Sequence, residues 1–379
     1  MSHSEKGNST APNGEVDLGN PPGVLGDITR QILAVSPLAQ TGAAVNAALT
    51  LAGTALARKV CGETILLTNI YLISLIDNSE AAQQIQAAVA RIAREAGLAD
   101  RIVHETPTGG EALLKRVAAT PNALFLFDDF DRLIKAALRD GAVRYKMELF
   151  VNLIKLFSSA DTILHGTEFA DQVRHPRVDI PYPCCSLHAT APAGSFYQMT
   201  SRLRSDHLRF LARFVVVDET TDPSGQRIVS GESQEPMENI LPWFVSVRSL
   251  QLRSSGVDAG PKSLIKVEKS KEASRLFDDH EKEMRDRRNH DQSDGLGYLW
   301  SRGWELADKI ALICACADNP NNSVVEERHA EWATQFVTRH TELLVNRLKA
   351  ESDSNATLSS KTRARQIDRS RLSQNADGI

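Results

Sequence analysis

Residues 122–131 read Asn-Ala-Leu-Phe-Leu-Phe-Asp-Asp-Phe-Asp, and the apolar run 124–127 leads directly into Asp128 and Asp129. A short, continuously apolar run bounded by polar residues is typical of a strand that is buried on both faces of a sheet. In a parallel sheet, both carboxylates would then lie at the carboxyl edge, where open α/β sheets bind their ligands. The stretch therefore predicts a central strand followed by a candidate site at Asp128 and Asp129.

Strand-like and helix-like segments alternate around this stretch, from residue 60 to residue 220. Short runs rich in apolar and β-branched residues predict strands at 70–76, 101–105, 124–127, 162–165, 184–190 and 213–218. Helical spacing of apolar residues predicts helices at 81–96, 112–119 and 148–157. This alternation favours a three-layer α/β fold with a mainly parallel sheet.

Composition divides the chain further. We predict a disordered leader at 1–20, N-terminal helices at 21–60, an α/β core at 61–235, a C-terminal helical region at 236–348 and a disordered basic tail at 349–379.

The overall composition is that of a soluble globular protein, with 42% hydrophobic and 24% charged residues in 379. The net charge of −4 provides no global basic field, so any contact with nucleic acid must come from a local patch. The five cysteines include no Cys-x-x-Cys pair, which favours reduced thiols in a cytoplasmic protein. We find no export signal and no membrane-spanning stretch, and the absence of the usual motifs disfavours a zinc hydrolase, a serine hydrolase or a dinucleotide enzyme.

The acidic strand has the pattern of the second nucleotide motif of P-loop ATPases, in which the first acid holds Mg²⁺ and the second polarises the attacking water. A strand of unrelated function that happens to end in acids is the alternative. The first nucleotide motif would fall in the turn formed by Asp77, Asn78, Ser79 and Glu80, where the sequence has no Gly and no Lys. A phosphate-binding loop needs glycines, a Lys and a Ser or Thr hydroxyl. Asp77 and Glu80 have capping-box spacing, and two acids at a helix N-terminus repel a polyphosphate, so we expect no normal Mg-ATP binding here.

Two other stretches are candidate anion contacts. Thr108 precedes Gly109 and Gly110 at the start of a predicted helix, and the glycines would let an anion approach the helix amides, although helix capping alone also explains them. The tail concentrates cations at Lys361, Arg363, Arg365, Arg369 and Arg371, against one acid. These cations would suit a phosphate backbone, and a solubilising tail is the alternative.

The chain resembles the helicase-like P-loop ATPase domain family of phage, plasmid and prophage replication proteins, which is often fused to primase-polymerase modules. The resemblance is carried, in chain order, by residues 22–28, 43–58, 68–71, 109–114, 124–131, 186–192 with Phe196, 208–218, 305–317 and 330–333. It implies a RecA/AAA-like P-loop fold, DNA or replication proteins as partners, a homo- or hetero-oligomeric ring, and Mg-ATP as the cofactor if the motor is active.

Particular residues take on roles through this resemblance. Asp128 would be the acid linked to Mg²⁺, Asp129 would stand at a position that is usually acidic, and Thr190 would be a sensor at the end of its strand. Arg213 would be an arginine finger that acts on the nucleotide of a neighbouring subunit; a structural ion pair is the alternative. The chain departs from the family at the phosphate loop, where Ala82 falls at the Lys position and Gln83 at the Ser or Thr position.

Three functional hypotheses follow. The first is a helicase-like protein of mobile-element DNA replication that has lost ATP hydrolysis, needs no cofactor, and binds DNA or partners in an assembly. The second is an active ATP-dependent DNA motor with an atypical phosphate site, or one that acts in trans through Arg213. The third is an unrelated soluble α/β binding protein.

Overall fold

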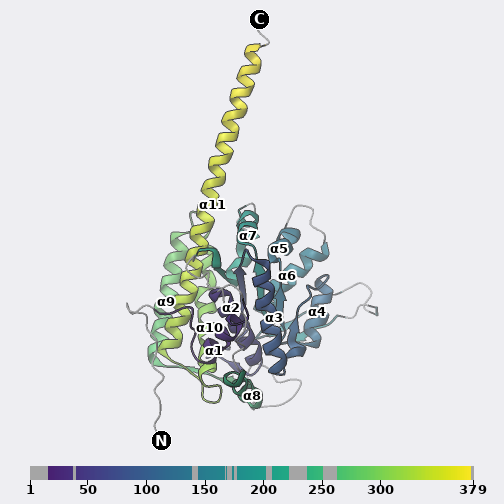
Figure 1. Ribbon diagram of the computed structural model, residues 1–379, viewed down its shortest axis with the longest axis vertical. Helices are drawn as coiled ribbons and strands as arrows, with labels where there is room; N and C mark the ends of the chain where they lie inside the picture. Colours follow the sequence, from purple (N-terminus) through teal and green to yellow (C-terminus); the bar gives the residue numbers. More distant parts are fainter. Residues whose placement is uncertain are drawn as a thin grey trace.

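A computed structural model describes residues 16–36, 40–138, 144–166, 168, 173–174, 177–201, 207–221, 237–250 and 263–376. The helices are α1 (Val24–Leu33), α2 (Thr41–Leu56), α3 (Ser79–Glu95), α4 (Gly110–Ala119), α5 (Phe130–Leu138), α6 (Arg144–Ser158), α7 (Ala193–Thr200), α8 (Leu241–Ser249), α9 (Lys271–His290), α10 (Gly303–Asp318) and α11 (Glu327–Ala376). In Figure 1, α9 and α11 lie on one side of the body, and α4, α5 and α6 lie on the other.

The centre of the fold is a parallel five-stranded sheet, which confirms the predicted mixed α/β class. Its strands, in spatial order, are β3 (Ile102–Val103), β4 (Leu124–Phe127), β7 (Ser186–Ala191), β2 (Tyr71–Leu75) and β8 (Phe214–Asp218). Every residue of β2, β4, β7 and β8 is buried, which is the physical reason why β2, β4 and β8 read as nearly continuous apolar runs.

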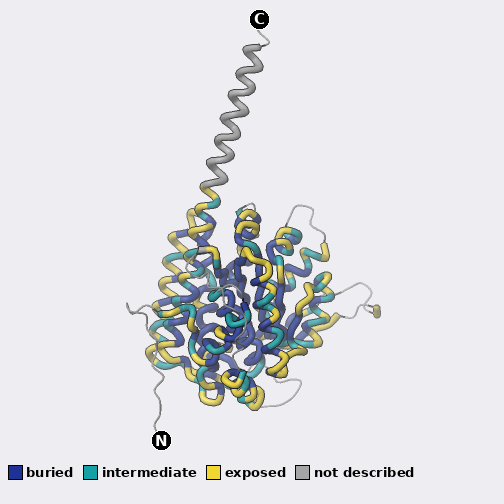
Figure 2. The backbone as a smooth tube through the Cα atoms, viewed as in Figure 1, coloured by how far each residue is buried: buried dark blue, intermediate teal, exposed yellow. Residues whose placement is uncertain are grey.

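Helices cover both faces of the sheet. Tyr71 and Ser74 of β2 point to opposite faces because side chains alternate along a strand. Ser74 contacts Asn46 of α2, and the Tyr71 hydroxyl donates to the Leu153 carbonyl of α6 at 3.0 Å. The α2 helix is rich in alanine and is buried along almost its whole length, so it packs between the sheet and other helices (Figure 2).

One continuous cluster of buried apolar side chains includes residues from α1 and α2, from the sheet, and from α10 and α11. The predicted boundaries at residues 60 and 235 therefore cross a shared core, and they stay a prediction. Residues 1–15 of the predicted leader lie outside the described residues, whereas Val16 and Leu18 pack against this core.

Some predicted elements differ in the structure. Residues 162–165 do not join the main sheet, because β5 (Ile163–Leu164) pairs antiparallel with β6 (Ile180–Pro181) to form a separate hairpin. The predicted tail is different as well, since α11 continues to Ala376. Residues 349–376 contain no Gly or Pro, so the sequence has nothing that ends the helix at the predicted boundary.

Among the described residues, no helix combines the length and the apolar character that crossing a membrane requires.

Candidate functional site

The carboxyl edge of the sheet brings Asp128 and Thr190 together. Phe127 and Ala189 are paired in register on β4 and β7, so the next position on each strand lies side by side. The Thr190 hydroxyl donates to Asp128 Oδ1 at 2.7 Å. Thr190 is buried and Asp128 is exposed, so a buried donor orients a carboxylate that faces solvent.

Asp129 points towards α5. Its φ of 49° lies in the left-handed region, which Asp tolerates better than most residues. Its amide donates to Asp128 Oδ1 at 2.9 Å, and its Oδ2 pairs with Arg132 Nη1 at 2.9 Å. The two adjacent acids thus have different partners, Thr190 for Asp128 and Arg132 for Asp129.

The turn after β2 is very short. The strand ends at Leu75 and the N-cap of α3 is Asn78, so only Ile76 and Asp77 lie between them. Asn78 Oδ1 accepts from the Ala81 amide at 2.9 Å, which corrects the prediction that Asp77 caps this helix. Asp77 Oδ1 accepts instead from the Ala193 amide at the start of α7, at 2.9 Å.

This turn does not fit the phosphates of Mg-ATP. The motif Gly-x-x-x-x-Gly-Lys-Ser/Thr surrounds phosphates with successive backbone amides, and the residues between Leu75 and Asn78 are too few to form such a loop. Ala82 is the fourth residue of α3 and is buried, and Gln83 is exposed. The helix begins at Ser79, and Glu80 lies in its first turn. The Glu80 carboxylate therefore lies near the free amides of the helix N-terminus, where it would repel a phosphate.

Sequence reasoning missed a buried polar row below the Asp128–Thr190 pair. Asn46 Nδ2 donates to Ser74 Oγ at 2.9 Å, and Ser74 Oγ lies 3.0 Å from His188 Nε2. All three residues are completely buried, and burial lowers the pKa of His188 to about 4, so this imidazole is neutral at pH 7. The sequence signal for this row was the presence of the polar residues Ser74 and His188 within predicted buried strands.

Asp131, the third acid of the decisive stretch, was given no role by the sequence. It lies in the first turn of α5 and is buried, and its carboxylate accepts a hydrogen bond from the Ser195 hydroxyl of α7. Asp77 and Asp131 therefore both hold the N-terminal turn of α7.

Arg213 lies at the opposite edge of the sheet. It ends the 3-10 helix His207–Arg213 and directly precedes β8, so it is at the amino edge, roughly 17 Å along the strand from Asp218 at ~3.3 Å per residue. Arg213 is half-buried, and burial together with neighbouring Arg302 lowers its pKa. It is not part of the Asp128 site of its own chain, and its action on a neighbouring subunit stays a prediction.

The glycine pair serves helix packing. Gly109, not Thr108, is the N-cap of α4, and its φ of −175° is accessible to any residue. A Cβ added to Gly110 would lie 2.7 Å from Asn152 Nδ2 and 3.0 Å from Glu148 Cβ. Because both neighbours belong to α6, the absence of a side chain at Gly110 is what lets α4 and α6 approach each other.

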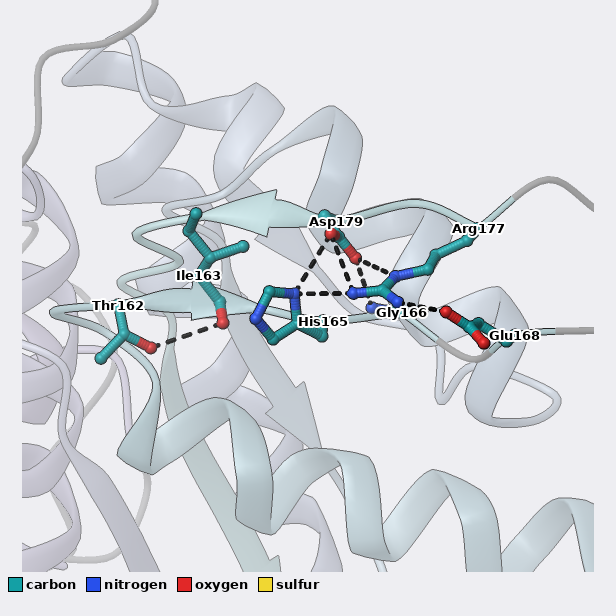
Figure 3. A network of polar contacts seen from close by, with 7 residues as sticks. All are labelled: Thr162, Ile163, His165, Gly166, Glu168, Arg177 and Asp179. Carbon is teal, nitrogen blue, oxygen red and sulfur yellow. Dashed lines mark hydrogen bonds and ion pairs between the residues drawn. The ribbon is translucent and has the colours of Figure 1, made fainter.

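Two further polar groups lie away from this edge. In the β5–β6 hairpin, Arg177 contacts Asp179 Oδ1 at 2.7 Å and lies 2.9 Å from His165 Nδ1, as Figure 3 shows. Hydrogen bonds from Arg177, the Gly166 amide and His165 hold the pKa of Asp179 well below its usual range. The cluster is exposed, and its hydrogen bonds connect the segments on either side of the β5–β6 pairing. The basic residues at 361–371 fall on α11, and their side chains lie outside the described part of the chain.

Comparison with known proteins gives little further information. No protein-family model matches the chain, and no curated protein matches it. Among solved structures, the chain is similar to a full-length MCM homolog from Methanopyrus kandleri, with a TM-score of 0.43 and 13% identity over 83% of this chain and 59% of that chain. The chain thus spans less than two thirds of that protein's length, and a similarity at this level assigns neither a shared fold family nor an activity.

Proposed function

We propose that this protein is a helicase-like protein of mobile-element DNA replication that has lost ATP hydrolysis and acts by binding DNA or protein partners in an assembly. The observation that carries the proposal is the turn between β2 and α3, which lacks the length and the residues of a phosphate-binding loop. Its Asp77 is already bound to the α7 amide of Ala193, and its Asn78 occupies the Ala81 amide of α3.

A RecA/AAA-like P-loop fold is part of the proposal. Support comes from the parallel sheet and from the position of β7, which separates the acid-bearing strand β4 from β2. Thr190 on that intervening strand donates to Asp128, as expected of a sensor next to a metal-linked acid. The sequence resemblance supplies the setting of DNA replication and the expectation of a ring.

DNA binding by this chain would depend on a local patch of positive charge. The chain is acidic overall, so contact with phosphate backbones requires concentrated cations such as those at 361–371. No specific observation favours an active motor, because helix packing already accounts for Gly109 and Gly110.

The ATP part is tested by a thermal melt with and without Mg-ATP at ~5 mM, on the wild type and on Asp128→Asn. A ligand at ~100 times its dissociation constant adds about 2.7 kcal/mol, which would raise Tm by several degrees. We expect no rise in either protein. A rise in the wild type that Asp128→Asn abolishes would overturn the loss of nucleotide binding. The variant Ala82→Lys is unsuitable as a rescue, because Ala82 is buried.

DNA binding is tested by fluorescence anisotropy with labelled single-stranded and duplex DNA at a series of salt concentrations. We expect an affinity that falls steeply as salt rises, because bound cations displace counterions from the phosphates. Absence of binding at low salt would instead favour the unrelated binding protein.

A further inference from the structure

A groove of about 910 Å³ lies outside the Asp128 site, between the start of α4 and the facing sides of α5 and α6. It begins at Thr106 and Pro107, which precede α4, and it continues along Tyr145 and Lys146 at the start of α6. Arg132 of α5 lines the groove and pairs with Asp129, so the groove adjoins the carboxyl edge of the sheet. Its volume is in the range of pockets that hold small ligands, which suits unstacked nucleotides better than a duplex.

The groove combines cations with an apolar floor. Its apolar lining is Leu133, Ala136 and Leu149, and its cations are Lys115, Arg132 and Lys146. Two acids, Glu111 and Glu148, line it as well, and Glu148 pairs with Arg144 at 2.7 Å. Lys146 has no acidic partner among the described residues.

The other two cations are held only loosely. Lys115 pairs with Glu111 at 2.7 Å, with 70% and 45% of the two side chains exposed. Arg132 pairs with Asp129 in a similarly exposed position. Ion pairs this exposed contribute little to stability, so a phosphate can replace the carboxylate partner.

Tyr145 gives the groove an aromatic surface. The residue is 48% exposed, although it lies against the start of α4. A Cβ added to Gly109 would lie 3.3 Å from Tyr145 Cβ and 3.7 Å from Cδ2, so the glycine lets the tyrosine sit beside the helix. The exposed part of the ring is free to stack on a base.

We infer that this groove binds single-stranded nucleic acid, with Tyr145 stacking on a base and with Lys146 and Arg132 facing the phosphates. Proteins that bind single strands without sequence preference combine an aromatic surface with cations along the backbone. The inference rests on the DNA-binding part of the proposed function and names a surface that would serve it.

Matched pairs of variants on α6 test the inference in the full chain. Tyr145→Ala is compared with Met147→Ala, because the two side chains are about equally exposed, at 48% and 45%, and Met147 lies outside the groove. Lys146→Ala is compared with Lys155→Ala, which removes an exposed charge from the same helix outside the groove. Tyr145→Phe keeps the ring. Anisotropy of a labelled oligo-dT of ~15 nucleotides and of a duplex gives the affinities, and circular dichroism checks that each variant is folded.

We expect Tyr145→Ala to weaken oligo-dT binding by about tenfold or more, with little change for Tyr145→Phe and Met147→Ala. Lys146→Ala should lower the slope of log affinity against log salt by about 0.7, the value for one phosphate contact on a single strand, whereas Lys155→Ala should leave it unchanged. Oligo-dT binding that is equal in Tyr145→Ala, Lys146→Ala and the wild type would overturn the groove while leaving DNA binding itself in place. A wild type that binds no DNA would overturn the groove and the DNA part of the proposed function together.

Discussion

The Thr190 hydroxyl donates to Asp128 Oδ1 at 2.7 Å, and this bond joins the ends of two adjacent parallel strands, β7 and β4. The two residues are separated by 62 positions in the chain. The bond shows that Asp128 and Thr190 form one structural unit at the carboxyl edge of the sheet.

This bond should contribute measurably to stability. We expect Thr190→Val, which keeps the shape but removes the donor, to lower the free energy of unfolding by roughly 1 kcal/mol. Thr190→Ser, which keeps the hydroxyl, should lower the free energy of unfolding by less than Thr190→Val does. Urea denaturation measures both, and a double-mutant cycle with Asp128→Ala isolates the pair. A coupling energy near zero would show that the contact does not stabilise the fold.

Asp77 and Asn78, in the turn between β2 and α3, should act on different helices. Asn78→Ala removes the N-cap of α3, and Asp77→Ala removes the acceptor for the first amide of α7. Each should lower the free energy of unfolding by about 1 kcal/mol, and Asn78→Asp should be almost neutral. Glu80→Ala, at an exposed position of the first turn that holds no backbone amide, is the control and should change stability by less than ~0.5 kcal/mol. If Asp77→Ala changes stability as little as this control, then the hydrogen bond from the Ala193 amide to Asp77 does not stabilise the fold.

Two glycines should respond with opposite signs to the same substitution. Gly110→Ala brings a Cβ within 2.7 Å of Asn152 Nδ2 and 3.0 Å of Glu148 Cβ, so it should destabilise by about 1–3 kcal/mol through overpacking. Gly194 lies in α7 with nothing within 4 Å of the added Cβ. Gly194→Ala should therefore stabilise by up to about 1 kcal/mol through helix propensity. A Gly110→Ala protein as stable as the wild type would contradict the close packing of α4 on α6.

Acid should destabilise the protein through His188, which is buried, and His340, which is half-buried. Burial lowers the pKa of His188 and of His340 to about 4 in the folded state, against ~6.5 when unfolded. Between these values the unfolded chain binds more protons, so the stability that depends on these groups is fully present above pH ~6.5 and is lost as pH falls towards 4. Each histidine should contribute a loss of about 2 kcal/mol between pH 7 and pH 5.

Urea denaturation at these two pH values measures the loss. In His188→Gln, the free energy of unfolding should fall less between pH 7 and pH 5, and the fall should be smaller by about half of the combined effect of the two histidines. The variant should also be less stable at pH 7, because packing around Ser74 is lost. A pH dependence identical to that of the wild type would show that His188 remains accessible to protons in the folded state.

The elements that the sequence predicted well are those whose pattern is local. Residues 124–127 are continuously apolar because β4 has neighbouring strands on both sides and is buried on both faces, so the strand could be read directly. The helices predicted within residues 21–60 are likewise present, as α1 and α2. The strand predicted at 162–165 is extended in the structure, but the prediction that it joins the main sheet was wrong. Its partner is β6, and this pairing depends on the distant residues 180–181.

The candidate site was predictable only in part, for the same reason. Asp128 and Asp129 follow a strand that is obvious in the sequence, and the absence of glycine in the turn after β2 is equally visible. The partners of Asp77 were not predictable, because Ala193 is 116 positions away and the local capping-box spacing pointed to α3 instead. Two other contacts were unpredictable for the same reason, because they also join distant segments. They are the hydrogen bond from Ser195 to Asp131 and the contact between Ser74 and His188.

The sequence by itself determined the α/β class, the buried central strand with its acids, and the absence of Gly and Lys from the turn after β2, because these follow from side-chain periodicity and residue identity over a few positions. Only the tertiary structure decided the strand order, the bonds from Thr190 to Asp128 and from Ala193 to Asp77, the position of Arg213 at the opposite edge, and the groove beside Tyr145. Each of these depends on which distant segments the shared core brings into contact, and no local pattern specifies that packing.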